Sequence, residues 1–421
     1  MNVLSKLLDK SAVDHKMGYH PKCKNLSLTH LSFADDILVF SDGNSRSIQS
    51  ILDVFGRFAN ISGLVMSVEK STIYCGGMQE ENRQAIQNQF HLDVGQLPVR
   101  YLGLPLLTKR MGKNDYQPLV EKLKKRISLW TNRFLSRAGR LQLIKSVLMS
   151  IINFWMSSFC LPGECLKEIN SLCSAFLWTG PELNARKAKI AWEVVTTKID
   201  EGGLGLRPLK EVNAVCCLKL IWRVTSSHSL WARWVKEYLF KGKTFWAVHS
   251  NSTLGSWVWR KLLKYRDKAK EFHHIEVNNG RGTSFWFDEW SDMGRLFDIV
   301  GARGCIDMGI SFTATVESAM TRRPRRHRYD LYVMIEEALN KQRSKMNHGK
   351  DVVLWKHNLN TFKPKFDTKS TWLLIRDSKP DVSWYSTVWF PSSTPKYSFM
   401  VWMRYIIGYP LETKCSSGTL D

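Results

Sequence analysis

The sequence contains 421 residues, of which 44% are hydrophobic, and carries a formal net charge of +23. This length and apolar content predict about three folded domains with real cores, which excludes a disordered chain. Lys and Arg outnumber Asp and Glu by 61 to 38, so a polyanionic partner is favoured, nucleic acid first and an anionic membrane surface second.

Neither the start nor the interior of the sequence is typical of secretion or of a membrane span. The start, "MNVLSKLLDK", carries charges too early for the apolar core of a signal peptide. The longest apolar run, "VLMSIINFWMSSFCL", is about fifteen residues with Ser and Asn inside, too short and too polar to cross a bilayer. The basic residues are spread along the chain instead of gathering on one amphipathic helix. We therefore predict an intracellular protein with no membrane partner.

The cysteines indicate neither a disulfide framework nor a metal centre. The nine cysteines include no CxxC pair and show no paired spacing with the eleven histidines. A complete zinc site is therefore not expected. We predict that these cysteines are simply buried thiols: Cys23, Cys75, Cys160, Cys173 and Cys216.

The segment "LSFADDILVF", residues 31–40, places two adjacent carboxylates between two short apolar runs. This pattern predicts a β-hairpin with Asp35 and Asp36 at its tip. Neighbouring carboxylates repel each other unless a cation neutralises both, and Mg²⁺ prefers such hard oxygen ligands. The pair could thus organise phosphoryl chemistry. A polar turn without metal is the commoner interpretation of an Asp-Asp pair, and both interpretations stay open at this point.

The segments after the hairpin complete a compact α+β unit. Residues 47–64 place apolar side chains at helical spacing and end near Gly63, which predicts a helix. Residues 64–77, "LVMSVEKSTIYCGG", predict a strand with its own turn. Residues 99–107, "VRYLGLPLL", predict a short extended element punctuated by Gly103 and Pro105.

From Tyr116 on, the apolar period becomes helical, and three successive amphipathic stripes predict a small helical bundle. The first stripe runs from Leu119 to Phe134, the second from Leu141 to Trp155, and the third from Leu166 to Phe176. Basic residues occupy the outer faces. For any single residue a solvated face is the ordinary explanation, but together the faces could track a nucleic-acid backbone. The candidate contacts are Lys122, Lys124, Lys125, Arg126, Arg140 and Lys145.

Beyond Gly180 the chain is rich in tryptophan. Aromatic residues interleaved with Arg and Lys could stack on bases, but such residues more often form a core, and we favour the core. Residues 321–330, "TRRPRRHRYD", form a dense basic loop. This loop could contact RNA or act as a nuclear address, and a merely solvated loop is an equally good explanation.

These motifs resemble the reverse transcriptase of plant LINE-type non-LTR retrotransposons over nearly the whole chain. "LTHLSFADDILVF" resembles the family's metal-binding palm hairpin, "SGLVMSVEKS" the element after it, and "YLGLPL" the primer-grip region. "GRLQLIKSVLMSIINFWMSSFCLP" and "CSAFLWTG" resemble the helical thumb. "EGGLGLRPLKEVNAVCCLKLIWR" and "NNGRGTSFWFDEW" resemble the connecting region, and "WYSTVWFPSSTPKYSFMVW" resembles the opening of the C-terminal zinc-binding segment.

The resemblance implies an α+β fold with a partial polymerase palm and its β-hairpin, a helical thumb bundle and a mixed Trp-rich C-terminal region. The expected domains are the C-terminal part of the palm with a primer-grip-like segment at 1–110, the thumb at 111–180, the Trp-rich connection at 181–300, the start of the zinc-binding segment at 301–404, and a frameshifted tail at 405–421.

The resemblance also implies a site. Asp35 and Asp36 would help to hold two Mg²⁺ ions that activate the primer 3′-hydroxyl and neutralise the leaving pyrophosphate. Lys70 would donate a proton or stabilise charge, although the family's usual Asn three positions before it is Ser67 here. The implied partners are an RNA template and a DNA primer, together with an intact retroelement polymerase, and the implied compartment is the nucleus.

Some parts of the family pattern are missing. Two-metal polymerases need a third carboxylate on a palm strand before the hairpin, and Asp9 and Asp14 lie in a segment that resembles the helix just before it. At the other end, a frameshift from about Tyr405 would remove the zinc ligands and make Cys415 accidental. We therefore expect a truncated, pseudogene-like polymerase that is inactive alone. The alternative is a non-catalytic RNA-binding module derived from a retroelement.

Overall fold

The computed structural model describes residues 1–107, 109–130, 135–249, 252 and 254–408. They fold into two compact units, one formed by Met1–Lys109 with Arg223–Ser256 and the other by Arg110–Trp222 with Trp257–Asp421. Helices mix with small sheets in the described residues, which is consistent with the expected α+β class. Along these residues, no helix combines the length and the apolar character that crossing a membrane requires.

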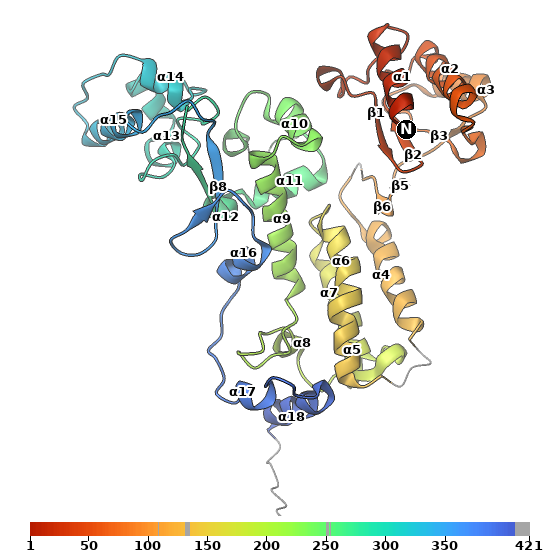
Figure 1. The fold of residues 1–421 in the computed structure, drawn as a ribbon, viewed down its shortest axis with the longest axis vertical. Helices are drawn as coiled ribbons and strands as arrows, with labels where there is room; N and C mark the ends of the chain where they lie inside the picture. The colour runs from red at the N-terminus through yellow and green to blue at the C-terminus, as the bar shows by residue number, and fades with distance from the viewer. Residues whose placement is uncertain (108, 131–134, 250–251, 253, 409–421) are drawn as a thin grey trace, which may run out of the picture. The chain divides into compact units, whose positions relative to one another are not determined.

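The first unit is built on two helices that pack against one hairpin (Figure 1). Its core consists of Leu4 and Leu8 from α1 with Val54 and Phe58 from α2. A buried hydrogen bond of 2.8 Å joins the hydroxyls of Ser11 and Ser50 across the same interface. The elements before the bundle are α1 (Asn2–Val13), β1 (His30–Phe33), β2 (Asp36–Val39), α2 (Ser45–Ser62), β3 (Thr72–Ile73), α3 (Glu80–Phe90), β4 (Asp93–Val94), β5 (Arg100–Tyr101) and β6 (Leu104–Pro105).

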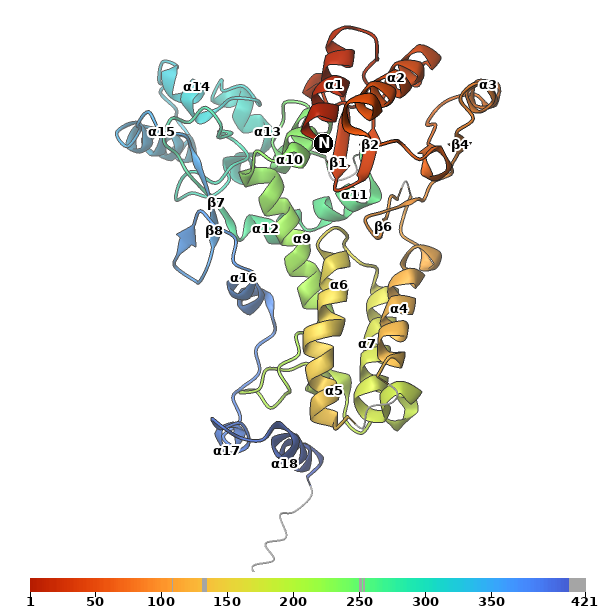
Figure 2. The same cartoon turned by 45° about the vertical axis from the view of Figure 1, so that its right-hand side comes forward.

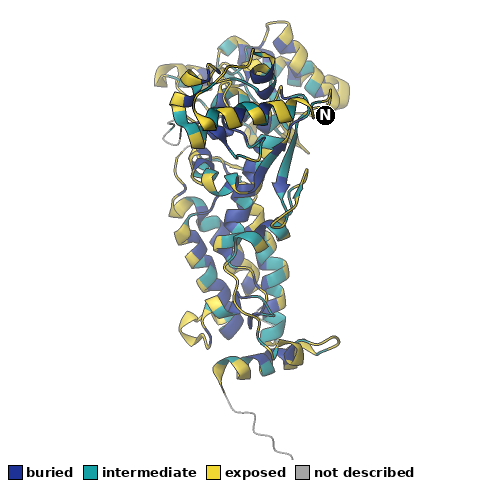
Figure 3. Cartoon of the chain, turned by 90° about the vertical axis from the view of Figure 1, so that its left-hand side faces the viewer, coloured by how far each residue is buried: buried dark blue, intermediate teal, exposed yellow. Residues whose placement is uncertain are grey.

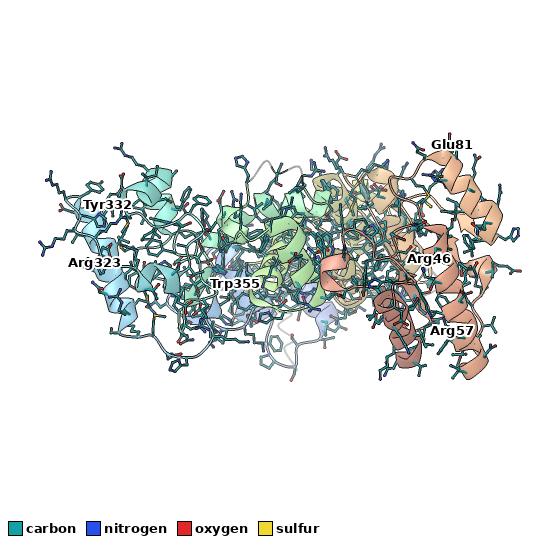
Figure 4. The ribbon with its side chains drawn as sticks, turned by 90° about the horizontal axis from the view of Figure 1, so that it is seen from above. Arg46, Arg57, Glu81, Arg323, Tyr332 and Trp355 are labelled. Atoms are coloured by element: carbon teal, nitrogen blue, oxygen red, sulfur yellow. The ribbon has the colours of Figure 1, made fainter. Side chains whose placement is uncertain are left out.

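Local sequence explains the boundaries of α2. The helix ends where Gly63 adopts a φ of 73°, a left-handed conformation that favours glycine, and the amide of Gly63 donates to the carbonyl of Ala59. The exposed face of α2 carries Arg46 and Arg57 (Figure 4). The predicted helix over residues 47–64 is therefore confirmed, with its start two residues earlier.

The strand predicted over residues 64–77 is confirmed only at Thr72–Ile73 and is wrong for the rest. Val68–Lys70 form a 3₁₀ turn, and only Thr72–Ile73 form a strand, which pairs in parallel with Asp93–Val94. The preceding residues Leu64 and Val65 are 62% and 82% exposed. An apolar run becomes a strand only where a neighbouring strand accepts its hydrogen bonds. Among the described residues, no strand pairs with residues 64–66. The "YLGLPL" segment is extended as predicted and forms the β5–β6 hairpin.

The first unit also includes a later segment of the chain. The helix α10 (Leu230–Val235) is followed by a π-helical turn (Lys236–Phe240) and a 3₁₀ turn (Phe245–Ala247). The indole of Trp234 donates to the carbonyl of Lys22 at 2.8 Å, and the Tyr238 hydroxyl accepts from the backbone amide of Asn25 at 3.1 Å.

The predicted three-helix bundle is present in the second unit (Figure 2). The first helix is α4 (Lys113–Ser128), and the third is α7 (Gly163–Thr179). The second is a continuous run of α5 (Arg137–Leu143), a π-helical turn (Ile144–Leu148) and α6 (Met149–Met156). Leu119, Leu123 and Ile127 are fully buried, as their spacing predicted, whereas Phe134 lies outside the described residues. Figure 3 shows buried and exposed residues interspersed along the helices of the chain.

The second unit also contains a three-stranded antiparallel sheet of order β7–β8–β9. Trp355 on β8 is fully buried, stacks on Phe272 at 5.5 Å between ring centroids, and donates its indole N–H to Thr371 (Figure 4). The elements are α8 (Trp192–Val195), α9 (Leu209–Ser226), α11 (Trp257–Lys264), α12 (Arg266–Lys270), β7 (His273–Glu276), α13 (Leu296–Asp307), α14 (Val316–Thr321), α15 (Asp330–Arg343), β8 (Val352–Lys356), β9 (Phe362–Lys363), α16 (Thr368–Ile375), α17 (Tyr385–Val388) and α18 (Pro395–Ile407).

The tryptophans and cysteines largely occupy the expected positions. Trp246, Trp257, Trp259, Trp286 and Trp290 are buried, so the core interpretation holds for them. The cysteine prediction is right for Cys23, Cys160 and Cys173, which are buried, and wrong for Cys75 and Cys216, which are half-buried.

The last part of the predicted 405–421 tail, including Cys415, lies outside the described residues, whereas residues 405–407 form the last turn of α18.

Candidate metal and nucleic-acid site

The aspartate pair lies at the turn of a two-stranded antiparallel hairpin. Phe33 pairs with Asp36, and the two residues between them form the turn. Ala34, the first turn residue, adopts a φ of 51°, which is unusual for a residue other than glycine. Asp35 follows it in the turn, and Asp36 opens β2. The predicted hairpin and the placement of both carboxylates at its tip are confirmed.

Side-chain alternation orients the hairpin on its unit. Ile37 and Val39 pack against the core formed by α1 and α2, so Asp36 and Leu38 belong to the opposite face. That face also includes Leu31 and Phe33, which are 37% and 61% exposed. The hairpin thus presents an apolar outer face with two exposed carboxylates at its end.

The environment of the pair is compatible with a divalent cation. Among the described residues, no Lys, Arg or His lies within 4.0 Å of the Asp35 or Asp36 carboxylate, and neither side chain accepts a protein hydrogen bond. Both carboxylates therefore remain open to hard cations such as Mg²⁺, which is often held by one or two carboxylates with water completing its shell.

Among the described contacts, Lys70 and Asp9 make none with the aspartate pair. Lys70 is exposed at the end of the 3₁₀ turn that replaces the predicted strand, and it forms no ion pair within the described part of the chain. Asp9 on α1 accepts a hydrogen bond of 2.5 Å from the Thr29 hydroxyl, next to His30. Asp9 therefore ties α1 to the start of the hairpin.

The candidate nucleic-acid contacts belong to the second unit and divide into two groups. Lys122, Lys124, Lys125 and Arg126 are exposed on α4, opposite its buried stripe. They offer the solvated cationic surface that backbone tracking needs.

Arg140 and Lys145 are instead half-buried. Burial lowers the pKa of Lys145, and a Cβ built on Gly205 would come within 3.7 Å of its Nζ. Burial also lowers the pKa of Arg140, as does the nearby charge of Arg137, while Glu182 raises it. A Cβ on Gly180, whose φ is +74°, would lie 3.0 Å from the Arg140 guanidinium carbon, so this guanidinium covers the end of α7.

One acidic cluster was not predicted from the sequence. Within the described ranges, Asp200, Glu201 and Asp381 bring their carboxylate oxygens within 4.8 Å of one another. Asp200 pairs with Lys198 at 2.7 Å, which lowers its pKa, and the buried Glu201 pairs with Arg376. These cations neutralise much of the cluster and give it a structural explanation.

A second feature that sequence patterns missed is the acceptor for the "NNGRG" segment. The Asp351 carboxylate accepts hydrogen bonds from the backbone amides of Asn278, Asn279 and Gly280 at 2.9–3.0 Å through Oδ1. Its Oδ2 accepts from the amide of Gly282 at 3.2 Å and from the Thr283 hydroxyl at 2.7 Å. In the sequence, this segment showed only a resemblance to the family's connecting region, and no local signal pointed to an aspartate about seventy residues away.

Comparison with known proteins places the hairpin in a family context. Residues 1–106 match the family of reverse transcriptases, RNA-dependent DNA polymerases. The matched region includes Asp35, Asp36 and Lys70, so the N-terminal unit contains a reverse-transcriptase-like polymerase segment.

A protein from Arabidopsis thaliana named "Putative ribonuclease H protein" is 30% identical to the chain over 194 residues. The matched segment is 44% of this chain and 31% of that protein.

Proposed function

We propose that the chain is part of a plant LINE-type non-LTR retrotransposon reverse transcriptase, an RNA-directed DNA polymerase. The observation that carries the proposal is the hairpin, because the reverse-transcriptase match covers it and both carboxylates are exposed at its turn. In this proposal Asp35 and Asp36 hold Mg²⁺, and Lys70 stabilises charge on the incoming nucleotide. Mg²⁺ bound there supplies a Lewis acid for transfer of a nucleotide to a primer 3′-hydroxyl.

The bundle of the second unit corresponds in this proposal to the thumb. The exposed cations of α4 would follow the backbone of an RNA template paired with a DNA primer. The chain's formal charge of +23 supports a polyanionic partner of this kind.

Metal binding at the hairpin is the first test. Mn²⁺ titrated into the purified chain, with the free ion followed by electron paramagnetic resonance, should bind weakly in the wild type. Asp35→Asn combined with Asp36→Asn should remove this binding, because both hard oxygen donors lose their charge. Asp53→Asn removes an equally exposed carboxylate from α2 and serves as the matched control. Equal binding by the double variant and the control would refute the metal role.

Primer extension tests catalysis separately. We expect the chain by itself not to extend a DNA primer on an RNA template, because two exposed carboxylates supply few protein ligands for two metal ions. Extension that disappears in Asp35→Asn would contradict the expected inactivity and would make the pair catalytic.

Salt dependence of binding tests the role of α4. Replacing Lys122, Lys124 and Lys125 together by Gln should lower the slope of log Kd against log salt by about 2 to 3 for an RNA–DNA hybrid. An unchanged slope would remove α4 from the interface. Tight binding with a steep slope but without metal binding would instead favour the retroelement-derived RNA-binding module.

A further inference from the structure

A pocket of about 360 Å³ opens in the second unit between three helix ends. Ser136 and Arg137 at the start of α5 line one side, Trp178 at the end of α7 lines another, and Lys396 and Phe399 of α18 close it. The helices α5 and α18 are in contact, and Figure 1 shows α18 beside the α5 end of the bundle.

The charge around this pocket is uniformly positive. Arg137, Arg140 and Lys396 all line it. Among the described residues, no carboxylate lies within 4.0 Å of any of these three cations, and none of their side-chain nitrogens donates a hydrogen bond to another residue. Arg137 and Arg140 repel each other, and Glu182 opposes this effect only at longer range. Cations gathered in this way favour an anionic ligand.

Trp178 forms a wall of the pocket and supports Arg137. Its side chain is buried, with 6% exposed, yet its Nε1 donor finds no acceptor in the described part of the structure. The guanidinium carbon of Arg137 lies 5.9 Å from the centroid of the indole, and the ring of Phe399 lies 6.2 Å from it. Because Nε1 is itself out of reach of solvent, the indole serves as a wall of the pocket on which Arg137 lies, not as a donor to a ligand.

The chemistry of the pocket selects the ligand class. Its charged groups are donors, which suits an oxyanion with several acceptor oxygens. Its volume lies at the low end of the range for ligand pockets, enough for a phosphate with its sugar. Base stacking is disfavoured because Trp178 and Phe399 are almost fully buried.

We propose that this pocket binds a backbone phosphate of a nucleic-acid strand through Arg137, Arg140 and Lys396. The inference rests on the proposed function and adds to it a defined contact outside the basic face of α4. Free inorganic phosphate offers the same chemistry, and an acidic peptide would be a different partner.

The direct test follows the indole N–H of Trp178 by nuclear magnetic resonance in the full chain labelled with ¹⁵N-tryptophan. Trp178→Phe identifies the signal. Titration with an RNA–DNA hybrid should shift it at concentrations where inorganic phosphate alone does not. An equal response to phosphate alone would overturn the assignment to a strand in favour of a free oxyanion, and a response only to a poly-glutamate peptide would overturn it in favour of an acidic protein.

Affinity measurements separate this inference from the proposed function. Arg137→Gln with Lys396→Gln should weaken hybrid binding about tenfold and lower the salt slope by about 1. Lys167→Gln, an exposed cation on α7 outside the pocket, is the matched control and should change neither. Hybrid binding that survives in the pocket variant as in the control would overturn the inference and leave the proposed function intact. A wild-type chain that binds no hybrid would overturn both.

Discussion

Asp351→Asn is expected to open one half of the loop at residues 278–283 and to spare the other half. The wild-type carboxylate accepts three amide hydrogen bonds on Oδ1 and two further bonds, from Gly282 and Thr283, on Oδ2. An asparagine keeps one oxygen, which will occupy the side with three donors. Its NH₂ group then faces the amide of Gly282 and the hydroxyl of Thr283, donor against donor.

The magnitude follows from the two lost bonds. A hydrogen bond to a charged group contributes about 1.5–3 kcal/mol, and relaxation of the loop recovers part of the loss, so we expect a local destabilisation of about 3 kcal/mol. This corresponds to roughly a hundredfold faster amide exchange at Gly282, with protection largely retained at Asn278, Asn279 and Gly280.

Hydrogen exchange resolved by residue is the assay for this change. Asp377→Asn, which removes another carboxylate from the same unit, provides the control for loss of charge alone. Uniform loss of protection across the loop, or no change at Gly282, would refute the reasoning that the two oxygens act separately.

Two further predictions concern stability. Burial and the neighbouring Arg295 and His274 lower the pKa of His273 from 6.5 to about 3. Between these two pH values, His273 therefore binds a proton in the unfolded chain but not in the folded chain. The stability from this group is present above pH 6.5 and is lost as the pH falls toward 3. Urea midpoints should therefore fall less steeply with acidification in His273→Asn than in the wild type or in the exposed-site control His15→Asn, and parallel profiles would contradict the assignment. Leu8→Ala should lower the free energy of unfolding of the first unit by about 2–5 kcal/mol, because Leu8 is fully buried against α2, whereas Val13→Ala at a 68% exposed position should change it little. Urea unfolding of both variants checks this, and equal midpoints would show that the core does not depend on Leu8.

Local sequence patterns predicted an element correctly wherever that element contains its own start and end signals. The hairpin was predictable because apolar residues flank Asp35 and Asp36 on both sides, and α2 was predictable because an apolar stripe ends at Gly63. Most of the strand predicted at residues 64–77 does not form because pairing depends on a partner, and the partner of Thr72–Ile73 is a two-residue strand beyond α3. No local signal marks such a partner.

The residues of the candidate site also divide into those that local patterns located and those that depend on distant parts of the chain. The sequence located the two carboxylates and the exposed cations of α4, but it could not show that Arg140 and Lys145 are half-buried, since that depends on Gly180 and Gly205. The acidic cluster and the acceptor role of Asp351 both join residues that are distant along the chain, and periodicity carries no information about them. Trp178 lies just beyond the third apolar stripe, and no sequence pattern shows that its indole N–H lacks an acceptor among the described residues.

The order of the sheet β7–β8–β9 has a consequence for how the protein is made. Strand β7 leaves the ribosome before its partner β8, with about 75 residues of chain between them, so at ~5–20 residues per second it waits on the order of 4–15 s for a partner. During this interval its edge is unpaired, and the amides of the loop at residues 278–283 lack the Asp351 carboxylate. Trp355 arrives on the same strand and buries itself against Phe272. The sheet, the loop and the burial of Trp355 are therefore completed together, when β8 is made. A ribosome that stalls within the intervening helices would leave a nascent chain with an unpaired strand edge, the form that chaperones must protect from aggregation.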